Sequence, residues 1–87
     1  MEYCALCNKQ KDDTHHLVFG ISNRKLSDED GLVIPVCREH HEMLHKNARV
    51  SKIIGQLMYE RNKCAEGYGL GAARESFMIR YGKNFMW

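Results

Sequence analysis

Two short motifs of cysteine and histidine restrict the possible folds of this chain more than any other feature. Cys4 and Cys7 form a C-x2-C pair near the N-terminus, and Cys37 and His40 form a C-x2-H pair later in the chain. Structural zinc sites take four thiolate or imidazole ligands in a tetrahedron. The two pairs therefore predict one structural Zn²⁺ site, although an arrangement in which His41 replaces His40 fits the spacing as well.

The length of the chain and its cysteine usage also favour a metal. A chain of 87 residues buries only about 60–65% of the surface of its unfolded form, and such small domains often depend on a metal, a disulfide or a partner. The N-terminal residues do not form an apolar segment of the signal-peptide type, so we do not expect export. Close cysteine pairs in the reducing cytosol usually bind metal. No apolar run is long enough to span a bilayer. We therefore expect a cytoplasmic metalloprotein without a membrane partner.

Hydrophobic periodicity and turn residues predict an α+β fold. The expected elements are strands at residues 14–19 and 32–36, a loop at 22–31, and helices at 37–47, 51–63 and 72–81. Ser51 is a candidate N-cap of the second helix, and Gly82 is a candidate C-terminal cap of the third. Cys64 is expected to be a small buried side chain. The side chains expected to face inward from the third helix are Phe77, Met78 and Tyr81.

A second group of histidines lies near the first. His41 and His45 are four residues apart, so both rings lie on one face of a helix and can meet one metal. His40 is rotated by about 100° from His41, which lets a single helix serve two sites. His15 or His16, on the first strand, completes three ligands with an open position, which is the pattern of a catalytic metal. The alternative is that His15 and His16 are packing or surface residues and only one zinc binds.

The order of these motifs resembles that of the HNH, or ββα-metal, nucleases, and it is closest to compact versions encoded by phages and prophages. The resemblance rests on the C-x2-C pair, on Thr14-His15-His16 and on residues 32–45, LVIPVCREHHEMLH. These stretches span about half of the chain. The resemblance implies an HNH-like zinc-bound core at residues 1–49, made of a zinc knuckle, a two-stranded hairpin and helix. Residues 50–87 are then a helical extension packed on that core within a single domain of two to three helices.

The resemblance also implies residue roles. His16 becomes the general base that activates water, while His15, His41 and His45 hold one divalent metal, Zn²⁺, Mg²⁺ or Mn²⁺. Since adjacent strand residues point to opposite faces, the roles of His15 and His16 could be exchanged. The partner of such an enzyme is DNA, and its place of action is the cytoplasm of a bacterial host cell.

Two departures from the family pattern keep a second function open. Gly31 stands where the family usually has an asparagine that orients the base, and Asp28, Glu29 and Asp30 place negative charge near the approach of a phosphate. The alternative to a DNA endonuclease is a catalytically inactive zinc protein that binds and inhibits a CRISPR or other defence protein of the host. Its binding surface would lie in the C-terminal half, among Tyr59, Tyr68, Phe77, Tyr81, Phe85, Trp87, Arg61, Arg74 and Arg80.

Charge alone does not choose between these partners. The chain has 13 basic and 11 acidic residues, for a net charge of +2, which is weak support for nucleic acid. Five basic residues could follow a phosphate backbone or be ordinary solvated side chains: Arg24, Lys25, Lys46, Arg49 and Lys52.

Overall fold

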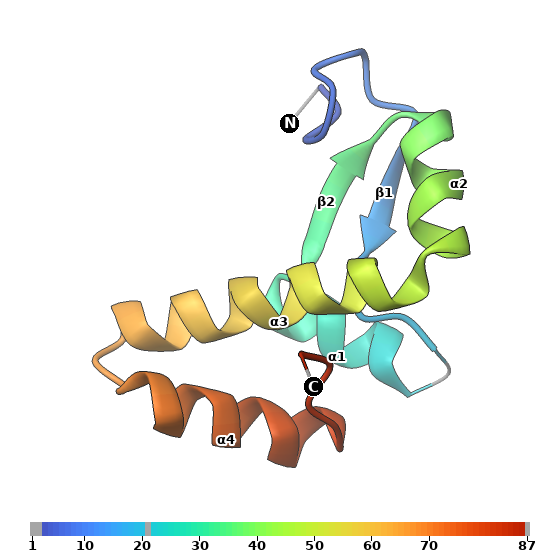
Figure 1. The fold of residues 1–87 in the computed structure, drawn as a ribbon. Helices are drawn as coiled ribbons and strands as arrows, with labels where there is room; N and C mark the ends of the chain where they lie inside the picture. The colour runs from blue at the N-terminus through green and yellow to red at the C-terminus, as the bar shows by residue number, and fades with distance from the viewer. Residues whose placement is uncertain (1–2, 21, 87) are drawn as a thin grey trace.

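The structure, a computed structural model, describes residues 3–20 and 22–86 of the chain (Figure 1). The expected interface role of Trp87 lies outside these residues. Strand β1 (Asp13–His16) pairs antiparallel with strand β2 (Val33–Val36), with His15 opposite Ile34. The predicted two-stranded hairpin is therefore confirmed, with Pro35 opposite Thr14 in a sheet that has no central strand.

The first strand is shorter than predicted, because the chain leaves the sheet after His16 and enters the core. The Leu17 N–H donates to the Leu32 carbonyl (2.9 Å). Ser27 then holds Val18 from both sides, since its hydroxyl donates to the Val18 carbonyl (2.6 Å) and accepts from the Val18 N–H (3.2 Å). A side chain thus satisfies the backbone where a sheet partner is missing.

Helix α1 (Asn23–Asp30) occupies the segment predicted as a loop, so that expectation is wrong. The segment lacks an apolar stripe, and Ser27 is its buried residue. The helix forms because Ser27 fits beneath it against the core, and it ends at Gly31, whose φ of 70° is left-handed. Packing against the rest of the fold therefore stabilises a helix that the local sequence pattern does not predict.

Three further helices complete the described chain: α2 (Arg38–Lys46), α3 (Ala48–Ala65) and α4 (Leu70–Tyr81). The first and third of these agree with the predicted helices, and Gly82 is the predicted left-handed cap, with φ 76°. Helix α3 begins three residues before Ser51, so the prediction of an N-cap there is wrong. Among the described residues, no helix is long and apolar enough to cross a membrane.

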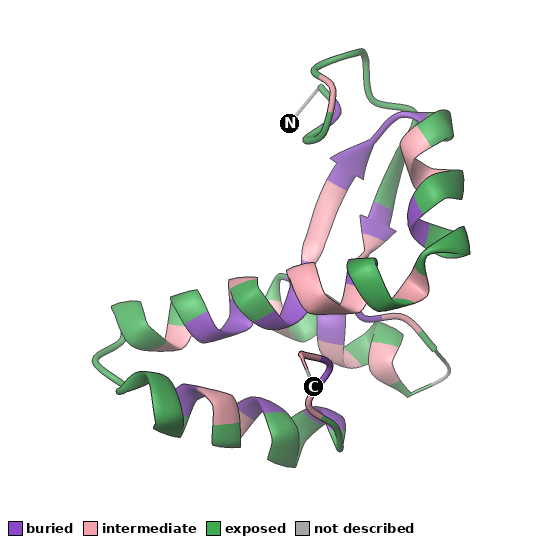
Figure 2. Cartoon of the chain, in the orientation of Figure 1, coloured by how far each residue is buried: buried purple, intermediate pink, exposed green. Residues whose placement is uncertain are grey.

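Two buried clusters hold these elements together (Figure 2). The larger joins the segment after β1 to the α3–α4 pair and the tail, through Leu17, Val18, Leu32, Tyr59, Phe77, Tyr81 and Phe85. The smaller lies between the knuckle, β2 and α2, and contains Cys4, Val36, Cys37 and Leu44. In Figure 1, α3 passes beneath the hairpin and α2, while α4 runs back antiparallel to α3. Ile54 of α3 packs against both clusters.

Two smaller expectations fail. Cys64 is exposed near the end of α3, and Met78 is 43% exposed on α4. A helical stripe facing one partner is narrow, so Phe77 and Tyr81 take the buried positions and Met78, the residue after Phe77, points outward.

Candidate metal centres

Cys4, Cys7, Cys37 and His40 lie together between the knuckle and the start of α2. Their ligand atoms fall within 4.8 Å of one another. The Sγ atoms of Cys7 and Cys37 are 3.7 Å apart, and His40 Nδ1 is 3.2 Å from Cys37 Sγ and 3.7 Å from Cys4 Sγ. Two thiolates bound at about 2.3 Å to a tetrahedral zinc lie about 3.8 Å apart. The four residues could therefore hold a metal ion such as zinc.

The knuckle is shaped by its own backbone. Asn8 takes a left-handed conformation (φ 62°), and the Asn8 N–H donates to the Cys4 carbonyl (2.9 Å), which closes a tight turn around the two thiols. Burial of Cys4 raises its pKa, but hydrogen bonds from the backbone of Cys37, Leu6 and Cys7 outweigh that effect and bring the pKa to about 6. A thiol with this pKa is largely thiolate at neutral pH, which is the form that binds metal.

Helix α2 separates the two groups of ligands as its geometry requires. His40 faces the cysteines, while His41, one position later, faces away from them toward His45. Of the two alternatives for the cysteine site, the structure therefore has His40 beside the thiols. His41 belongs to a second group.

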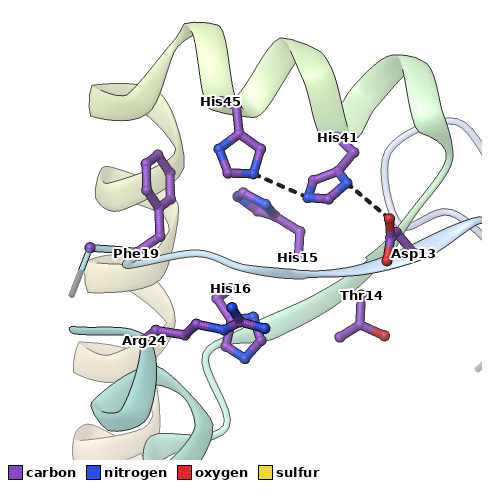
Figure 3. A pocket seen from close by; sticks show the side chains of 9 residues that line it. Asp13, Thr14, His15, His16, Phe19, Arg24, His41 and His45 are labelled. Carbon is purple, nitrogen blue, oxygen red and sulfur yellow. Dashed lines mark hydrogen bonds and ion pairs between the residues drawn. The ribbon is translucent and has the colours of Figure 1, made fainter. Parts of the chain in front are cut away.

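The second group consists of His15, His41 and His45, whose ligand atoms also fall within 4.8 Å of one another (Figure 3). His15 reaches up from β1, and the other two come down from α2. The Nε2 atoms of His41 and His45 are 3.2 Å apart. Two imidazoles bound at about 2.0–2.1 Å to a tetrahedral zinc have nitrogens about 3.3 Å apart, so this spacing fits two ligands of one ion.

Hydrogen bonds to the far side of two rings select the tautomers that metal binding needs. Ser51 donates its one hydroxyl proton to the Leu17 carbonyl (2.7 Å), so its oxygen must accept from His15 Nε2 at 2.8 Å. His15 Nδ1 then keeps its lone pair. Similarly, the Asp13 carboxylate lies 3.3 Å from His41 Nδ1 and favours the proton on that nitrogen, so the lone pair is on His41 Nε2 and can bind a metal.

His15 is well suited to be a neutral ligand. It is 1% exposed. Burial lowers the pKa of His15 to about 4, with smaller contributions from the charges of the neighbouring His41, His45 and His16. The ring is therefore unprotonated at neutral pH, which is the state in which imidazole binds metal.

His16 points to the other face of β1, as neighbouring strand residues must. Its Nε2 lies 3.1 Å from Asp28 Oδ1 of α1. His16 nevertheless shares with the three clustered histidines a pocket of about 580 Å³, which Arg24 and Phe19 also line. The two neighbouring histidines therefore occupy different places: His15 belongs to the cluster, and His16 lines the pocket beside it.

Three residues contact histidines at this site in ways that the sequence did not predict, namely Asp13, Asp28 and Ser51. Asp13 and Asp28 carry no spacing signal relative to the histidines. Ser51 is 36 positions away from His15, and only the packing of α3 under the hairpin brings them together. The acidic segment is also divided, because Asp28 contacts His16 while Glu29 and Asp30 pair with Arg80.

The residues expected to form a protein-binding surface in the C-terminal half are mostly unavailable. Their aromatic members Tyr59, Phe77, Tyr81 and Phe85 are buried in the larger cluster, so for them the expectation is wrong. Arg74 forms an ion pair with Glu60, at 3.1 Å, and Arg80 with Asp30. The four aromatic side chains therefore belong to the buried core, and the two arginines form ion pairs within the fold.

Comparison with known proteins gives a family without a known activity. Over 43 residues the chain is 42% identical to a protein of Escherichia coli (strain K12) described as "Uncharacterized protein YdfU". That match covers 48% of the chain but 12% of the relative, so the chain spans a small part of it. No solved structure matches the chain. A family described as "Protein of unknown function (DUF968)" matches residues 1–66, and the chain belongs to this family.

Proposed function

We propose that this chain is a metal-dependent DNA endonuclease of the HNH type. The observation that carries the proposal is the convergence of three imidazoles, His15, His41 and His45, at an open pocket lined also by His16 and Arg24. Three protein ligands beside open space fit a catalytic metal. The cysteine site is proposed to hold a structural Zn²⁺.

The chemistry follows from the groups around the pocket. A divalent ion on the three histidines would stabilise the negative charge that grows on the scissile phosphate and its leaving oxygen. Arg24 is exposed at the same pocket and supplies a positive charge for the approaching phosphate. His16 is the general base, because it lines the pocket without belonging to the ligand cluster.

Asp28 is proposed to replace the asparagine that this chain lacks at Gly31. Its carboxylate accepts from His16 Nε2, which fixes the tautomer with a lone pair on Nδ1. Nδ1 can then take the proton of a water. The carboxylate also stabilises the imidazolium that this transfer creates.

A plasmid-nicking assay with Mg²⁺, Mn²⁺ and Zn²⁺ tests the proposal. The parent protein should nick supercoiled DNA with at least one of these ions. His16→Ala should lower the rate by about 10²- to 10⁴-fold, the usual contribution of a general base. Asp28→Ala should lower it by about tenfold or more, because it removes only the orientation of that base.

Metal content separates the roles in the same experiment. Elemental analysis should find two ions per chain in the parent and in His16→Ala, but one in His41→Ala. A parent protein that cleaves with none of the three ions contradicts the proposal. Cleavage that survives His16→Ala but not His15→Ala would reverse the assignment of base and ligand.

A further inference from the structure

A second, smaller cavity lies outside the metal centres. Its volume is about 200 Å³, and its lining residues are Arg49, Lys52, Lys83 and Phe85. Arg49 and Lys52 come from the first turns of α3, whereas Lys83 and Phe85 belong to the tail after α4. Three cations from two distant segments therefore meet at one place, which we name the basic strip (Arg49, Lys52 and Lys83).

The tail is held in this position by a buried polar network. Gln56 of α3 is fully buried, and its carbonyl oxygen accepts from the Phe85 N–H (2.8 Å). Its amide group donates to the side chains of Asn84 and Glu60, both at 2.8 Å. Every hydrogen bond that fixes this corner is therefore buried or partly buried, so the place of Lys83 beside α3 is part of the fold.

The basic strip is continuous with the pocket of the histidine cluster. The Lys52 ammonium lies over two rings, 5.2 Å from the centre of Phe19 and 5.6 Å from that of Phe85. Phe19 lines the metal pocket, and its ring centre is 4.8 Å from that of His45. Because a duplex advances about 3.4 Å per nucleotide along each strand, the strip lies within a few nucleotides of the cluster.

The ion pairs of the described residues lie away from the basic strip. Among the described residues, ion pairs of lysine and arginine form at Lys9, Lys63, Arg74 and Arg80, and none includes a member of the basic strip. Arg49 and Lys83 are exposed. Unpaired cations that meet at one place, two of them exposed, are the charge pattern that a phosphate backbone neutralises.

We infer that Arg49, Lys52 and Lys83 bind the phosphate backbone of the duplex beside the scissile phosphate. The choice of DNA as the substrate rests on the proposed function. Phe85 is 8% exposed and lies beneath lysines, so it offers no face on which a base could stack. The contact is therefore to phosphates alone and independent of base sequence.

The test is the salt dependence of DNA binding. Zinc-loaded His16→Ala protein serves as the background, so that the DNA stays intact. Fluorescence anisotropy with a labelled duplex of about 20 base pairs gives the dissociation constant at salt concentrations from about 50 to 200 mM. Lys52→Gln and Lys83→Gln should each weaken binding about eightfold at 0.1 M salt and lower the slope of log affinity against log salt by about one.

Lys63→Gln is the matched control. Lys63 is on the same helix and also lies over two rings, those of Tyr59 and Tyr68, but it is at the far end of α3 and pairs with Glu66. It should bind DNA as the background protein does. Equal loss in Lys63→Gln and Lys52→Gln, or parental binding in both strip variants, would overturn the inference. Since Lys83 is exposed, Lys83→Gln decides the matter even where Lys52→Gln melts below the background protein.

Two duplexes of unrelated sequence should bind equally, and a preference of tenfold or more would also overturn the inference. The outcomes separate it from the proposed function. Loss of binding in the strip variants of a protein that never nicks DNA supports the basic strip and contradicts the endonuclease. When Lys52→Gln and Lys83→Gln are made in the parent protein, with His16 intact, nicking at the parental rate together with unchanged binding in the His16→Ala background contradicts the basic strip and leaves the endonuclease standing.

Discussion

The hydroxyl of Ser51 makes two hydrogen bonds at once, one as donor and one as acceptor. It donates to the Leu17 carbonyl and accepts from His15 Nε2, so it both anchors the segment after β1 and orients the His15 ring, a candidate metal ligand. Residues that hold a ligand in place typically contribute 10- to 100-fold to metal affinity, as an order-of-magnitude estimate of about 1.4–2.7 kcal/mol. We therefore expect Ser51→Ala to weaken zinc binding at the histidine cluster by about that factor, measured by competition with a chromophoric chelator.

Ser76→Ala is the control for this residue-scale prediction. Its hydroxyl contacts Tyr59 Oη at 2.7 Å, so the change also removes a partly buried hydrogen bond, but it does so away from both metal centres. Zinc affinity should stay at the parental value in Ser76→Ala. Parental affinity in Ser51→Ala as well would mean that Ser51 serves the backbone alone.

At the scale of elements, the close approach of α3 to the segment after β1 decides where the site lies. Gly55 makes that approach possible, because a Cβ there would be 2.7 Å from Val18 Cγ2 and 3.1 Å from Leu17 Cβ. Gly55→Ala would gain up to about 1 kcal/mol of helix propensity but lose about 1–3 kcal/mol to overpacking. We expect a net loss of about 1 kcal/mol, or a fall in melting temperature of about 4–8 °C.

Gly71→Ala is the matched substitution on α4. A Cβ at Gly71 would meet nothing within 4 Å, so the loss of freedom in the unfolded chain should stabilise the protein by about 0.4–1 kcal/mol. Thermal melts followed by circular dichroism compare the two variants. Stabilisation by both would show that α3 can move away from Val18 at little cost.

At the scale of the whole molecule, we expect the hairpin and α2 to depend on the cysteine site, because the buried cluster around that site is small. That cluster has four buried members, two of which are the candidate ligands Cys4 and Cys37. Structural zinc binding contributes about 10–16 kcal/mol in small zinc domains, which equals or exceeds the about 5–15 kcal/mol stability of a typical domain. Cys37→Ser should therefore abolish the cooperative melt of the hairpin and α2, as measured by near-ultraviolet circular dichroism.

Cys64→Ser provides the comparison, since Cys64 is exposed and outside both metal groups. It should melt as the parent does. A strong chelator should reproduce the effect of Cys37→Ser in the parent protein, and added Zn²⁺ should reverse it. A parental melt in Cys37→Ser would mean that packing alone sustains this part of the fold.

The sequence by itself determined that His40 and His41 face different sides of α2 and that His15 and His16 point to opposite faces of β1. The structure decided that His40 lies beside the thiols and that His15 joins the histidine cluster. The rules that act on the sequence alone are local: helical residues three or four apart share a face, and neighbouring strand residues do not. His40 and His41 therefore had to serve different groups, and His15 and His16 had to point apart. The hairpin and three of the four helices in the described part of the chain follow from patterns of the same short range.

Only the tertiary structure decided the groups that surround these ligands. The helix at Asn23–Asp30, the hydrogen bond from His16 Nε2 to Asp28 and the place of Ser51 all depend on contacts between segments that are not neighbours in the chain. Burial likewise withdrew Tyr59 and Phe85 from the predicted binding surface, because the sequence shows which side chains are apolar but not which partner covers them. Local periodicity acts over a few residues, whereas orientation of a site is set by how whole elements pack.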